Sequence, residues 1–285
     1  MKAVKKAVIL AGGLGTRFLP ATLGVPKELF PIGDKPILFY HFEECVKSGI
    51  TDVCMVMNRG KNSIDGFIHP NKELLDILEY DNKNNYLDEY KSVMSKLKIT
   101  VLIQEKPLGT ADAVYTAKDW VNGDPFVVIN GDDMFLCDKP ATKQLIEMYN
   151  KTGEPTLLFQ EVEKEKIKNY GCAKLNKDRT LDEIVEKPSV KEAPSNLASL
   201  GRYLLLPQIF DCIKNLKKVG REYRLPDAIN IFCKKQKINC IILDGDYIDC
   251  GSKLEFSKGF TKIMMNNPEF GKDYINFIKD IAKNL

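Results

Sequence analysis

A run of small and cationic residues near the N-terminus is the feature of this sequence best suited to chemistry. An apolar stretch at residues 7–10 leads into the run AGGLGTR at residues 11–17, and Lys27 follows in a Pro-Lys-Glu triplet. Glycines let backbone N–H groups approach a phosphate or a base closely. Arg17 and Lys27 beside such amides suit a polyphosphate whose charge must be held while one phosphoryl bond breaks. The plainer alternative is a tight turn with two solvated cations.

This loop matches neither of two common nucleotide-binding motifs. The dinucleotide fingerprint G-x-G-x-x-G would need a glycine at position 18 after Gly13 and Gly15, where the chain has Phe18. A Walker A loop needs flanks that neither Gly60 nor Gly271, each followed by lysine, possesses. The sequence therefore excludes both the dinucleotide fingerprint and a P-loop NTPase.

Two aspartates follow stretches that we expect to be strands. Asp132 comes after the apolar run at 126–129, at the carboxyl end of a strand, where open α/β sheets bind ligands. Asp249 closes a later strand-rich stretch. Two carboxylates from distant strands suit Mg²⁺, which takes a few oxygen ligands together with water and substrate phosphates. Asp133 competes with its neighbour and could instead cap a turn or reach a ribose.

The elements that must position these residues follow an α/β pattern. Short, unalternated apolar runs, typical of strands buried on both faces, lie at residues 7–10, 53–57, 99–103 and 126–129. Amphipathic helices are predicted between them, over 34–49, 71–95, 109–121 and 140–150. In the first of these, Asp34 is expected to be the cap, Pro36 to lie in the first turn and Gly49 to end the helix. The first half thus predicts a Rossmann-like, mostly parallel central sheet flanked by helices.

The pattern changes after about residue 153. Shorter strands are predicted at 156–162, 172–176, 198–206 and 238–245, with helices from about 208 and 225, which indicates a mixed-sheet elaboration. The tail, 252–285, is expected to be helical. Tyr274, Ile278 and Ile281 would share one face of it, packed on the body or on another subunit.

Composition excludes several classes of protein. The 285 residues include 42 Lys plus Arg and 39 Asp plus Glu, for a net charge of +3, and 44% are hydrophobic. This is enough for one substantial core, which excludes a disordered chain and a miniature disulfide scaffold. Because no dense basic stripe and no apolar run of about 18 residues is present, we expect neither nucleic-acid nor membrane binding.

The cysteines and the N-terminus indicate a cytoplasmic protein. The eight cysteines include no C-x-x-C pair, and only His41 and His69 could join them, which argues against zinc. They lie among apolar residues, as reduced, buried thiols do. Residues 1–16 superficially match a signal peptide, but crowded glycines, the following Arg17 and the lack of a small-x-small cleavage site favour a strand running into a loop.

Longer stretches of the chain resemble the sugar-1-phosphate nucleotidylyltransferases, and within them the bacterial UTP–glucose-1-phosphate uridylyltransferases. The matching stretches occur in the family's order: GLGTRFLPAT and PKELFPIGDKP near the start, LGTADAV at 108–114, NGDD at 130–133, VEKP at 185–188, APSNLASLGRY at 193–203 and DCGSK at 249–253. The triplet PKE together with APSNLA-x-x-GRY points to the uridylyltransferase branch.

The resemblance implies a reaction in which a phosphate oxygen of glucose 1-phosphate attacks the α-phosphorus of UTP, giving UDP-glucose and pyrophosphate. Because two anions must meet, the protein should supply Mg²⁺, cationic side chains and in-line positioning rather than a covalent nucleophile. The implied partners are UTP and glucose 1-phosphate, in a homodimer or homotetramer. One domain, 1–285, is expected, with a nucleotide-binding half at about 1–150, a sugar-binding half at about 151–251 and C-terminal helices at 252–285.

The resemblance also implies a role for individual residues. They are Asp132 and Asp249 for the metal; Arg17, Lys27 and Lys187 for catalysis; Ala11, Gly12, Gly13, Gly15, Thr16, Gln104 and Gly109 for the nucleotide; and Gly171, Glu186 and Lys187 for the sugar. The carboxamide of Gln104 can donate to a carbonyl and accept from an imide N–H, the pattern that uracil and thymine share. It does not separate UTP from dTTP. Taken alone, Glu186-Lys187-Pro188 is a common exposed turn, and Gly171 suits a simple β-turn.

Two departures from the family's pattern keep alternatives open. Leu23 stands where the family usually has lysine, and Arg224 and Pro226 stand where the uridylyltransferases commonly carry Gln and Thr. The first alternative is the same chemistry on another pyrimidine nucleotide, such as dTTP, or on another sugar. The second is a non-catalytic nucleotide-sugar-binding paralogue, which the missing charge at Leu23 motivates.

Overall fold

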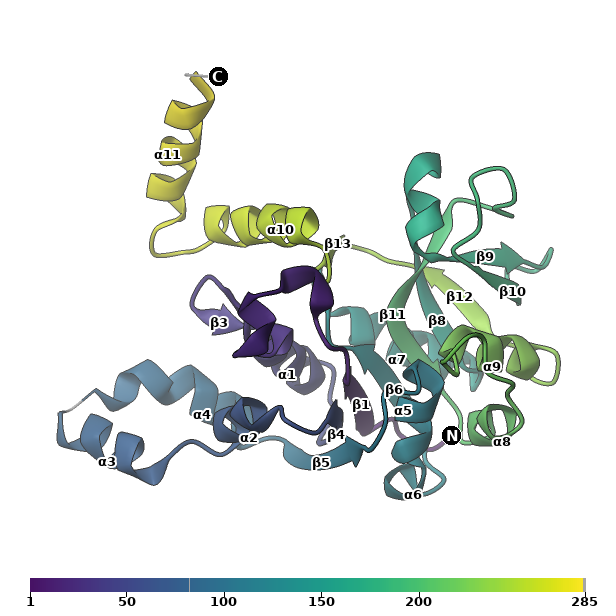
Figure 1. Cartoon of the computed structure of the whole chain (residues 1–285), viewed down its shortest axis with the longest axis horizontal. Coiled ribbons are helices and arrows are strands. Elements are labelled where there is room, and N and C mark those ends of the chain that lie inside the picture. Colours follow the sequence, from purple (N-terminus) through teal and green to yellow (C-terminus); the bar gives the residue numbers. More distant parts are fainter. Residues whose placement is uncertain (82, 284–285) are drawn as a thin grey trace.

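A nine-stranded sheet forms the centre of the molecule. The computed structural model of the chain describes residues 1–81 and 83–283, and Figure 1 shows the sheet with helices around it. Its first-half strands are β1 (Lys6–Ala11), β4 (Asp52–Asn58), β5 (Lys98–Gln104) and β6 (Phe126–Asn130). They are mutually parallel, in the order β6-β1-β4-β5, so the predicted parallel sheet is confirmed.

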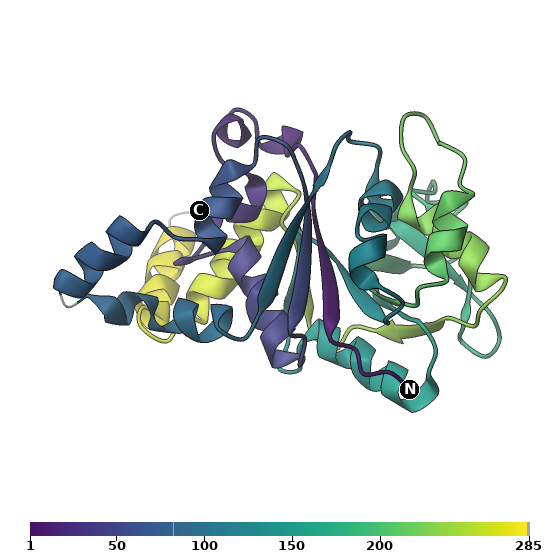
Figure 2. The same ribbon diagram turned by 90° about the horizontal axis from the view of Figure 1, so that it is seen from below.

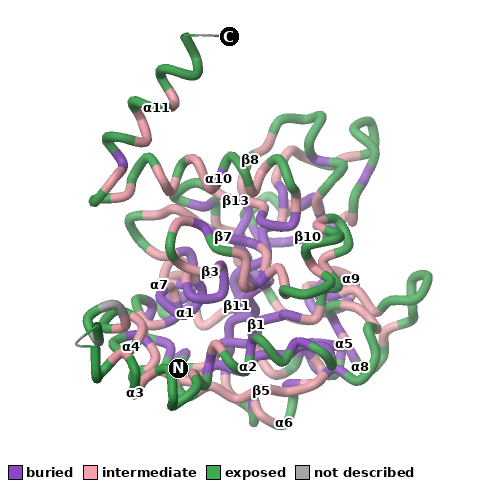
Figure 3. The backbone as a smooth tube through the Cα atoms, turned by 60° about the vertical axis from the view of Figure 1, so that its left-hand side comes forward, coloured by how far each residue is buried: buried purple, intermediate pink, exposed green. Residues whose placement is uncertain are grey.

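Helices cover both faces of this sheet, as Figure 2 shows from below. Along β1, Val8 and Leu10 belong to one apolar cluster, and Ala7 and Ile9 belong to the other. The helices on the first side are α5 (Thr110–Thr116), α6 (Lys118–Val121), α8 (Ile209–Lys214) and α9 (Leu225–Cys233). Those on the second side include α1 (Ile37–Lys47), α2 (Asn62–Ile68), α4 (Asp88–Met94) and α7 (Ala141–Thr152). Burial is accordingly concentrated on the strands, as Figure 3 shows.

The second half of the chain extends the sheet with mixed directions, as predicted. β11 (Leu197–Leu205) pairs antiparallel with β6 and joins the two halves. The strands beyond it are β8 (Thr156–Glu161), β9 (Gly171–Leu175), β10 (Leu181–Glu186) and β12 (Asn239–Ile242). β12 runs parallel to β8, whereas β8 and β9 run antiparallel to β11.

The predicted start of the first helix is wrong. Asp34 lies in the turn of a small hairpin, between β2 (Pro31–Ile32) and β3 (Lys35–Pro36), and α1 begins only at Ile37. Gly33 has a φ of 70°, which a two-residue hairpin turn needs and glycine adopts at low cost. Gly49, with a φ of 81°, follows the end of this helix as expected.

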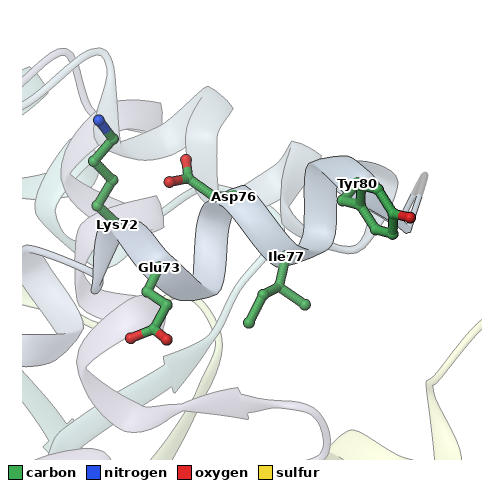
Figure 4. Close-up of a pocket in the computed structure, with 5 residues that line it drawn as sticks. All are labelled: Lys72, Glu73, Asp76, Ile77 and Tyr80. Carbon is green, nitrogen blue, oxygen red and sulfur yellow. The ribbon is translucent and has the colours of Figure 1, made fainter.

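The helix predicted over 71–95 is divided. α3 (Lys72–Tyr80) is followed by a 3-10 turn (Asn84–Leu87) and then by α4. Four of the five residues at 81–85 are Asp or Asn, which have low helix propensity. α3 contains no buried residue and stands apart from the sheet. Figure 4 shows the side chains that line a shallow hollow on it, namely Lys72, Glu73, Asp76, Ile77 and Tyr80.

The last predicted strand, 238–245, is too long, because only Asn239–Ile242 of it form a strand. β12 ends at Ile242, and β13 (Asp246–Asp249) then pairs antiparallel with β7 (Asp133–Leu136) in a separate ribbon. Sequence reasoning predicted neither β7 nor this pairing. In its register, Asp249 lies opposite Asp133.

The tail forms two helices, α10 (Lys253–Met265) and α11 (Gly271–Lys283), and its last two residues lie outside the described chain. α11 projects from the body (Figure 1), so much of the apolar face expected to pack remains open, and Ile281 is 42% exposed. Among the described residues, no helix combines the length and the apolarity that crossing a bilayer requires. All eight cysteines are free thiols.

Candidate active site

The glycine-rich loop begins where three parallel strands end together. β1 ends at Ala11, which pairs with Met57 of β4. The next residue of β4, Asn58, pairs with Gln104 at the end of β5. A methyl group placed on Gly12 would lie 2.9 Å from Gln104 Oε1 and 3.5 Å from Asn58 Oδ1. A side chain at this position would therefore collide with Gln104, which explains the glycine.

The loop presents free hydrogen-bond donors. Within residues 1–81 and 83–283, the backbone N–H groups of Gly13, Leu14 and Gly15 find no acceptor. Gly15 has a φ of 63°, and the hydroxyl of Thr22 donates to its carbonyl at 2.9 Å, which closes the loop. Thr16 follows in an exposed 3-10 turn (Thr16–Phe18). Successive unpaired N–H groups in such a turn form a concavity that binds anions.

Lys27 lies between this loop and the predicted metal ligands. Its Nζ would be 3.4 Å from a methyl group on Gly13, and it donates a hydrogen bond to Asp132. Burial disfavours the charged ammonium, but the carboxylates of Asp132 and Glu28 outweigh burial and raise the pKa of Lys27 above its ordinary value. The ammonium is therefore held in its charged form beside the loop.

A buried ion pair supports both the loop and Lys27, and sequence reasoning missed it. Lys61 Nζ donates to the carbonyl of Ala11 at 2.6 Å and to both carboxylate oxygens of Glu28 at 3.0 and 2.9 Å. Glu28 is fully buried. The Pro-Lys-Glu triplet could have indicated Glu28 as a site residue. No local sequence pattern indicates Lys61. The pair ties the end of β1 to the residue next to Lys27.

Asp132 and Asp249, predicted as the metal ligands, converge on Gly251. A methyl group placed there would lie 2.8 Å from Asp132 Oδ2 and 3.1 Å from Asp249 Oδ1. Burial works against ionised Asp132, but the ammonium of Lys27 outweighs it and lowers the pKa of this carboxyl; burial raises the pKa of Asp249. In the described chain no three His, Cys, Asp or Glu residues gather as a metal cluster. Such a pair leaves coordination positions for water and phosphate oxygens, as Mg²⁺ requires.

Asp133 has partners of its own. Its Oδ2 accepts from Asn130 Nδ2 at 2.9 Å, and its Oδ1 accepts from the hydroxyl of Tyr247 at 2.5 Å. Burial, followed by the neighbouring charge of Asp132, raises its pKa to about 6. These bonds tie Asp133 to the end of β6 and to β13, so the structure gives it a bracing position at the base of the ribbon.

A cleft of about 920 Å³ opens beside the two aspartates. The predicted site residues that line it are Arg17, Asp132, Gly171, Glu186, Lys187 and Asp249. Those that lie outside it, around the end of β1, are Ala11, Gly12, Gly13, Gly15, Thr16, Lys27, Gln104 and Gly109. Lys27, bonded to Asp132, connects the two groups.

The far end of the cleft is formed by β9, β10 and the turn after β10. A methyl group on Gly171 would lie 2.9 Å from Ile184 Cγ2 and 3.2 Å from Glu186 Oε2, so this glycine makes room for the carboxylate. Lys187 has a φ of 47°, which is rare for a residue with a side chain, and its N–H donates to Tyr170 at 3.0 Å. Such strain persists only where the surroundings fix the backbone.

The cleft also contains residues that sequence reasoning missed. They are Thr110, Asn130, Lys166, Lys168, Tyr170, Ser199, Tyr203, Glu222 and Tyr247, among others. The sequence pattern around them is weak, because most of these residues lie on short strands or turns that come together only in the folded protein. Arg17 and Lys168 are lining cations that form no salt bridge within the described chain, although the charge of Arg17 acts on Asp132 and Asp249. Arg224 and Pro226 also line the cleft, whereas Leu23, 80% exposed, does not.

A buried network fixes the backbone before Asp132. Arg202 donates to Glu44 at 2.8 Å and 3.1 Å and to His41 Nδ1 at 3.1 Å. Because Arg202 can only donate, Nδ1 of His41 accepts, and its Nε2–H donates to the carbonyl of Gly131 at 3.1 Å. Burial, aided by the charge of Arg202, lowers the pKa of His41 to about 4. A neutral imidazole therefore holds the peptide that precedes Asp132.

The chain has full-length relatives among known proteins. Residues 6–265 match the sequence model of the nucleotidyl transferase family. The chain is 38% identical to a UTP–glucose-1-phosphate uridylyltransferase of Staphylococcus epidermidis, over 99% of each chain. It is 37% identical to one of Bacillus subtilis, over 99% of this chain and 97% of that protein.

Solved structures give the same result. The UTP-bound UGPase of Acinetobacter baumannii superposes with a TM-score of 0.89 at 31% identity, over 96% of this chain and 98% of that one. A UDP-glucose pyrophosphorylase complexed with UDP-glucose gives a TM-score of 0.85 at 30% identity, over 93% of this chain and 100% of the other. By its motifs, its fold and its full-length relatives, this chain belongs to the nucleotidyl transferase family.

Proposed function

We propose that this chain transfers the uridylyl group of UTP to glucose 1-phosphate, which yields UDP-glucose and pyrophosphate. The observation that carries the proposal is the approach of three features to one another: free loop N–H groups, the carboxylates around Gly251, and a cleft that ends at Glu186 and Lys187. The relatives at 37–38% identity carry the corresponding name, and the similar solved structures hold UTP or UDP-glucose.

In this proposal the glycine loop and its cations hold the triphosphate. The N–H groups from Gly13 to Gly15 bind phosphate oxygens, while Arg17 and Lys27 balance their charge. Leu23, where the family usually carries lysine, adds no charge. The unpaired Lys168, which lines the same cleft as Arg17, offers a replacement cation.

Mg²⁺ fits the pair of aspartates. Asp132 and Asp249 place oxygens near one point beside Gly251, they are not joined by a third ligating side chain of the described chain, and oxygen is the ligand atom that Mg²⁺ prefers. When bound there, the ion would neutralise phosphate charge and polarise the phosphoryl group. The protein's own part is to hold both carboxylates and Lys27 in place.

The sugar end follows from the far wall of the cleft. Glu186 accepts hydrogen bonds from sugar hydroxyls, Gly171 makes room for its carboxylate, and Lys187 holds the phosphate of the sugar. With the nucleotide at the loop and the sugar phosphate at Lys187, the attacking oxygen and the α-phosphorus meet beside the aspartates. This gives residues 1–150 the nucleotide and residues 151–251 the sugar, within one domain.

The assembly and the compartment are also part of the proposal. The largely open face of α11 offers a surface for a second copy, which fits the expected homodimer or homotetramer. The eight free thiols suit a reducing, cytoplasmic environment.

The test is pyrophosphate release with UTP, glucose 1-phosphate and Mg²⁺, repeated with EDTA and with dTTP in place of UTP. Metal-dependent release with UTP is expected. Faster release with dTTP would instead favour thymidylyl transfer, the nearest alternative. Folded protein that binds UDP-glucose but releases no pyrophosphate from any triphosphate would favour a non-catalytic nucleotide-sugar-binding paralogue, for which Leu23 is the specific motive.

A further inference from the structure

Both amide hydrogens of Gln104 are used within the chain. Nε2 donates to the carbonyl of Gly109 at 3.1 Å and to Oδ2 of Asp112 at 2.8 Å. A carbonyl and a carboxylate can only accept, so an amide flipped by half a turn would face both of them with its oxygen. The orientation of this buried amide is therefore determined by its neighbours.

The oxygen of Gln104 faces the other way, toward the glycine loop. Oε1 would lie 2.9 Å from a methyl group on Gly12, and within the described chain it accepts no hydrogen bond. Two other side-chain oxygens, Ser48 Oγ and Asn58 Oδ1, also lack a hydrogen-bond partner but are fully buried. Oε1 of Gln104 is not among these buried atoms, so a ligand can reach it. Gln104 thus offers a ligand at Gly12 an acceptor and no donor.

Asp112 is well placed to hold this amide. It lies in the first turn of α5, where a carboxylate interacts favourably with the helix dipole. The start of α5 is itself anchored from the start of α9 and the residues before it, because Ala111 donates to the carbonyl of Tyr223 at 3.0 Å and Leu225 donates to the hydroxyl of Thr110 at 3.0 Å. The carboxylate therefore comes from a fixed backbone.

We propose that Asp112 determines which nucleobase this protein accepts, by holding the amide of Gln104 so that only its oxygen faces the base. The inference rests on the proposed function, in which Gln104 contacts the base. It also revises the prediction that Gln104 both donates and accepts. Uracil presents its N3–H to the oxygen, whereas cytosine presents a lone pair at N3, and two acceptors repel. Asp112 is thus a positioning residue for base selection.

The test compares the kcat/KM for UTP and for CTP at saturating glucose 1-phosphate. Asp112→Ala removes a hydrogen bond to a charged group and is expected to lower the preference for UTP over CTP roughly tenfold or more. Asp112→Asn is expected to keep most of the preference, because the asparagine oxygen still accepts from Nε2. The KM for glucose 1-phosphate should not change. Asp119→Ala, which removes an exposed aspartate of the neighbouring α6, is the matched control.

A double-mutant cycle with Gln104→Leu separates the inference from the proposed function. If Asp112 acts through Gln104, adding Asp112→Ala to Gln104→Leu leaves the UTP/CTP ratio of the single Gln104→Leu variant unchanged. A ratio that falls in Gln104→Leu but not in Asp112→Ala overturns the inference and leaves the base contact standing. An unchanged ratio in Gln104→Leu overturns the base contact and the inference with it. Equal losses in Asp112→Ala and Asp112→Asn would assign the effect to charge and overturn the orienting role.

Discussion

Replacing Lys61 with methionine should unfold the protein more readily and weaken UTP binding, for separate reasons. The change leaves Glu28, which is fully buried, without its ammonium partner. Breaking a buried ion pair from one side costs about 3–5 kcal/mol of unfolding free energy. For a chain of this length that corresponds to a fall in Tm of about 5–8 °C.

The double variant Lys61→Met, Glu28→Met distinguishes the two reasons. With both charges gone, no charge remains buried and unpaired, so the free energy of unfolding should recover to within about 1–2 kcal/mol of the original. The carbonyl of Ala11, which accepts from Lys61 at 2.6 Å, is still unheld. The KM for UTP should therefore stay raised in the double variant.

Urea unfolding followed by circular dichroism measures the first effect, and initial rates of pyrophosphate release measure the second. A single variant as stable as the original protein would refute the reasoning on the ion pair. A double variant that regains the original KM for UTP would refute the role of Lys61 in holding the end of β1.

Three further predictions concern the metal ligands, acid stability and one glycine. Asp132→Ala and Asp249→Ala should each abolish turnover while the circular dichroism spectrum stays unchanged; normal Mg²⁺-dependent turnover in either variant would exclude the metal assignment. His41 takes up a proton near pH 6.5 when unfolded and near pH 4 when folded, so stability should be lost as the pH falls through that window, by up to about 3 kcal/mol. Urea midpoints from pH 7 to pH 4 check this, and His41→Gln, which cannot titrate, should lose less over the same window. Gly109→Ala meets a φ of 99° and a backbone oxygen of Tyr223 at 2.5 Å, so it should cost about 1–3 kcal/mol; a Tm equal to that of the original protein would contradict this.

Local patterns in the sequence were sufficient to predict the strands and much of the candidate site. The apolar runs that became β1, β4 and β6 are buried on both faces, so burial alone marks them. The run that became β5 lies at the edge of the sheet and is only partly buried, so the expectation of full burial is wrong for that strand. The glycine loop was predictable because its glycines meet local needs of the backbone, such as the φ of 63° at Gly15. The ends of parallel strands then place such loops together without further information.

Contacts between distant segments could not be predicted in this way. β7 and β13 have only four residues each, and neither shows a clean alternation. Lys61 meets Glu28, and Arg202 meets Glu44, only after the sheet has formed. The amide of Gln104 was expected to donate to a base, but nothing local to it in the sequence shows that Asp112 occupies that donor.

Asp132 and Asp249 come together only when β7 pairs with β13, two strands that are far apart in the sequence. The register of these strands joins Asp133 to Asp249, so every strand of the second half lies within the loop of chain that this pairing closes. Closing a long loop costs entropy that only contacts formed elsewhere can offset. We therefore expect the two carboxylates to meet late in folding, after the sheet has assembled. A partly folded chain would then present the glycine loop without the acidic pair, and a newly synthesised protein would complete the proposed metal site last.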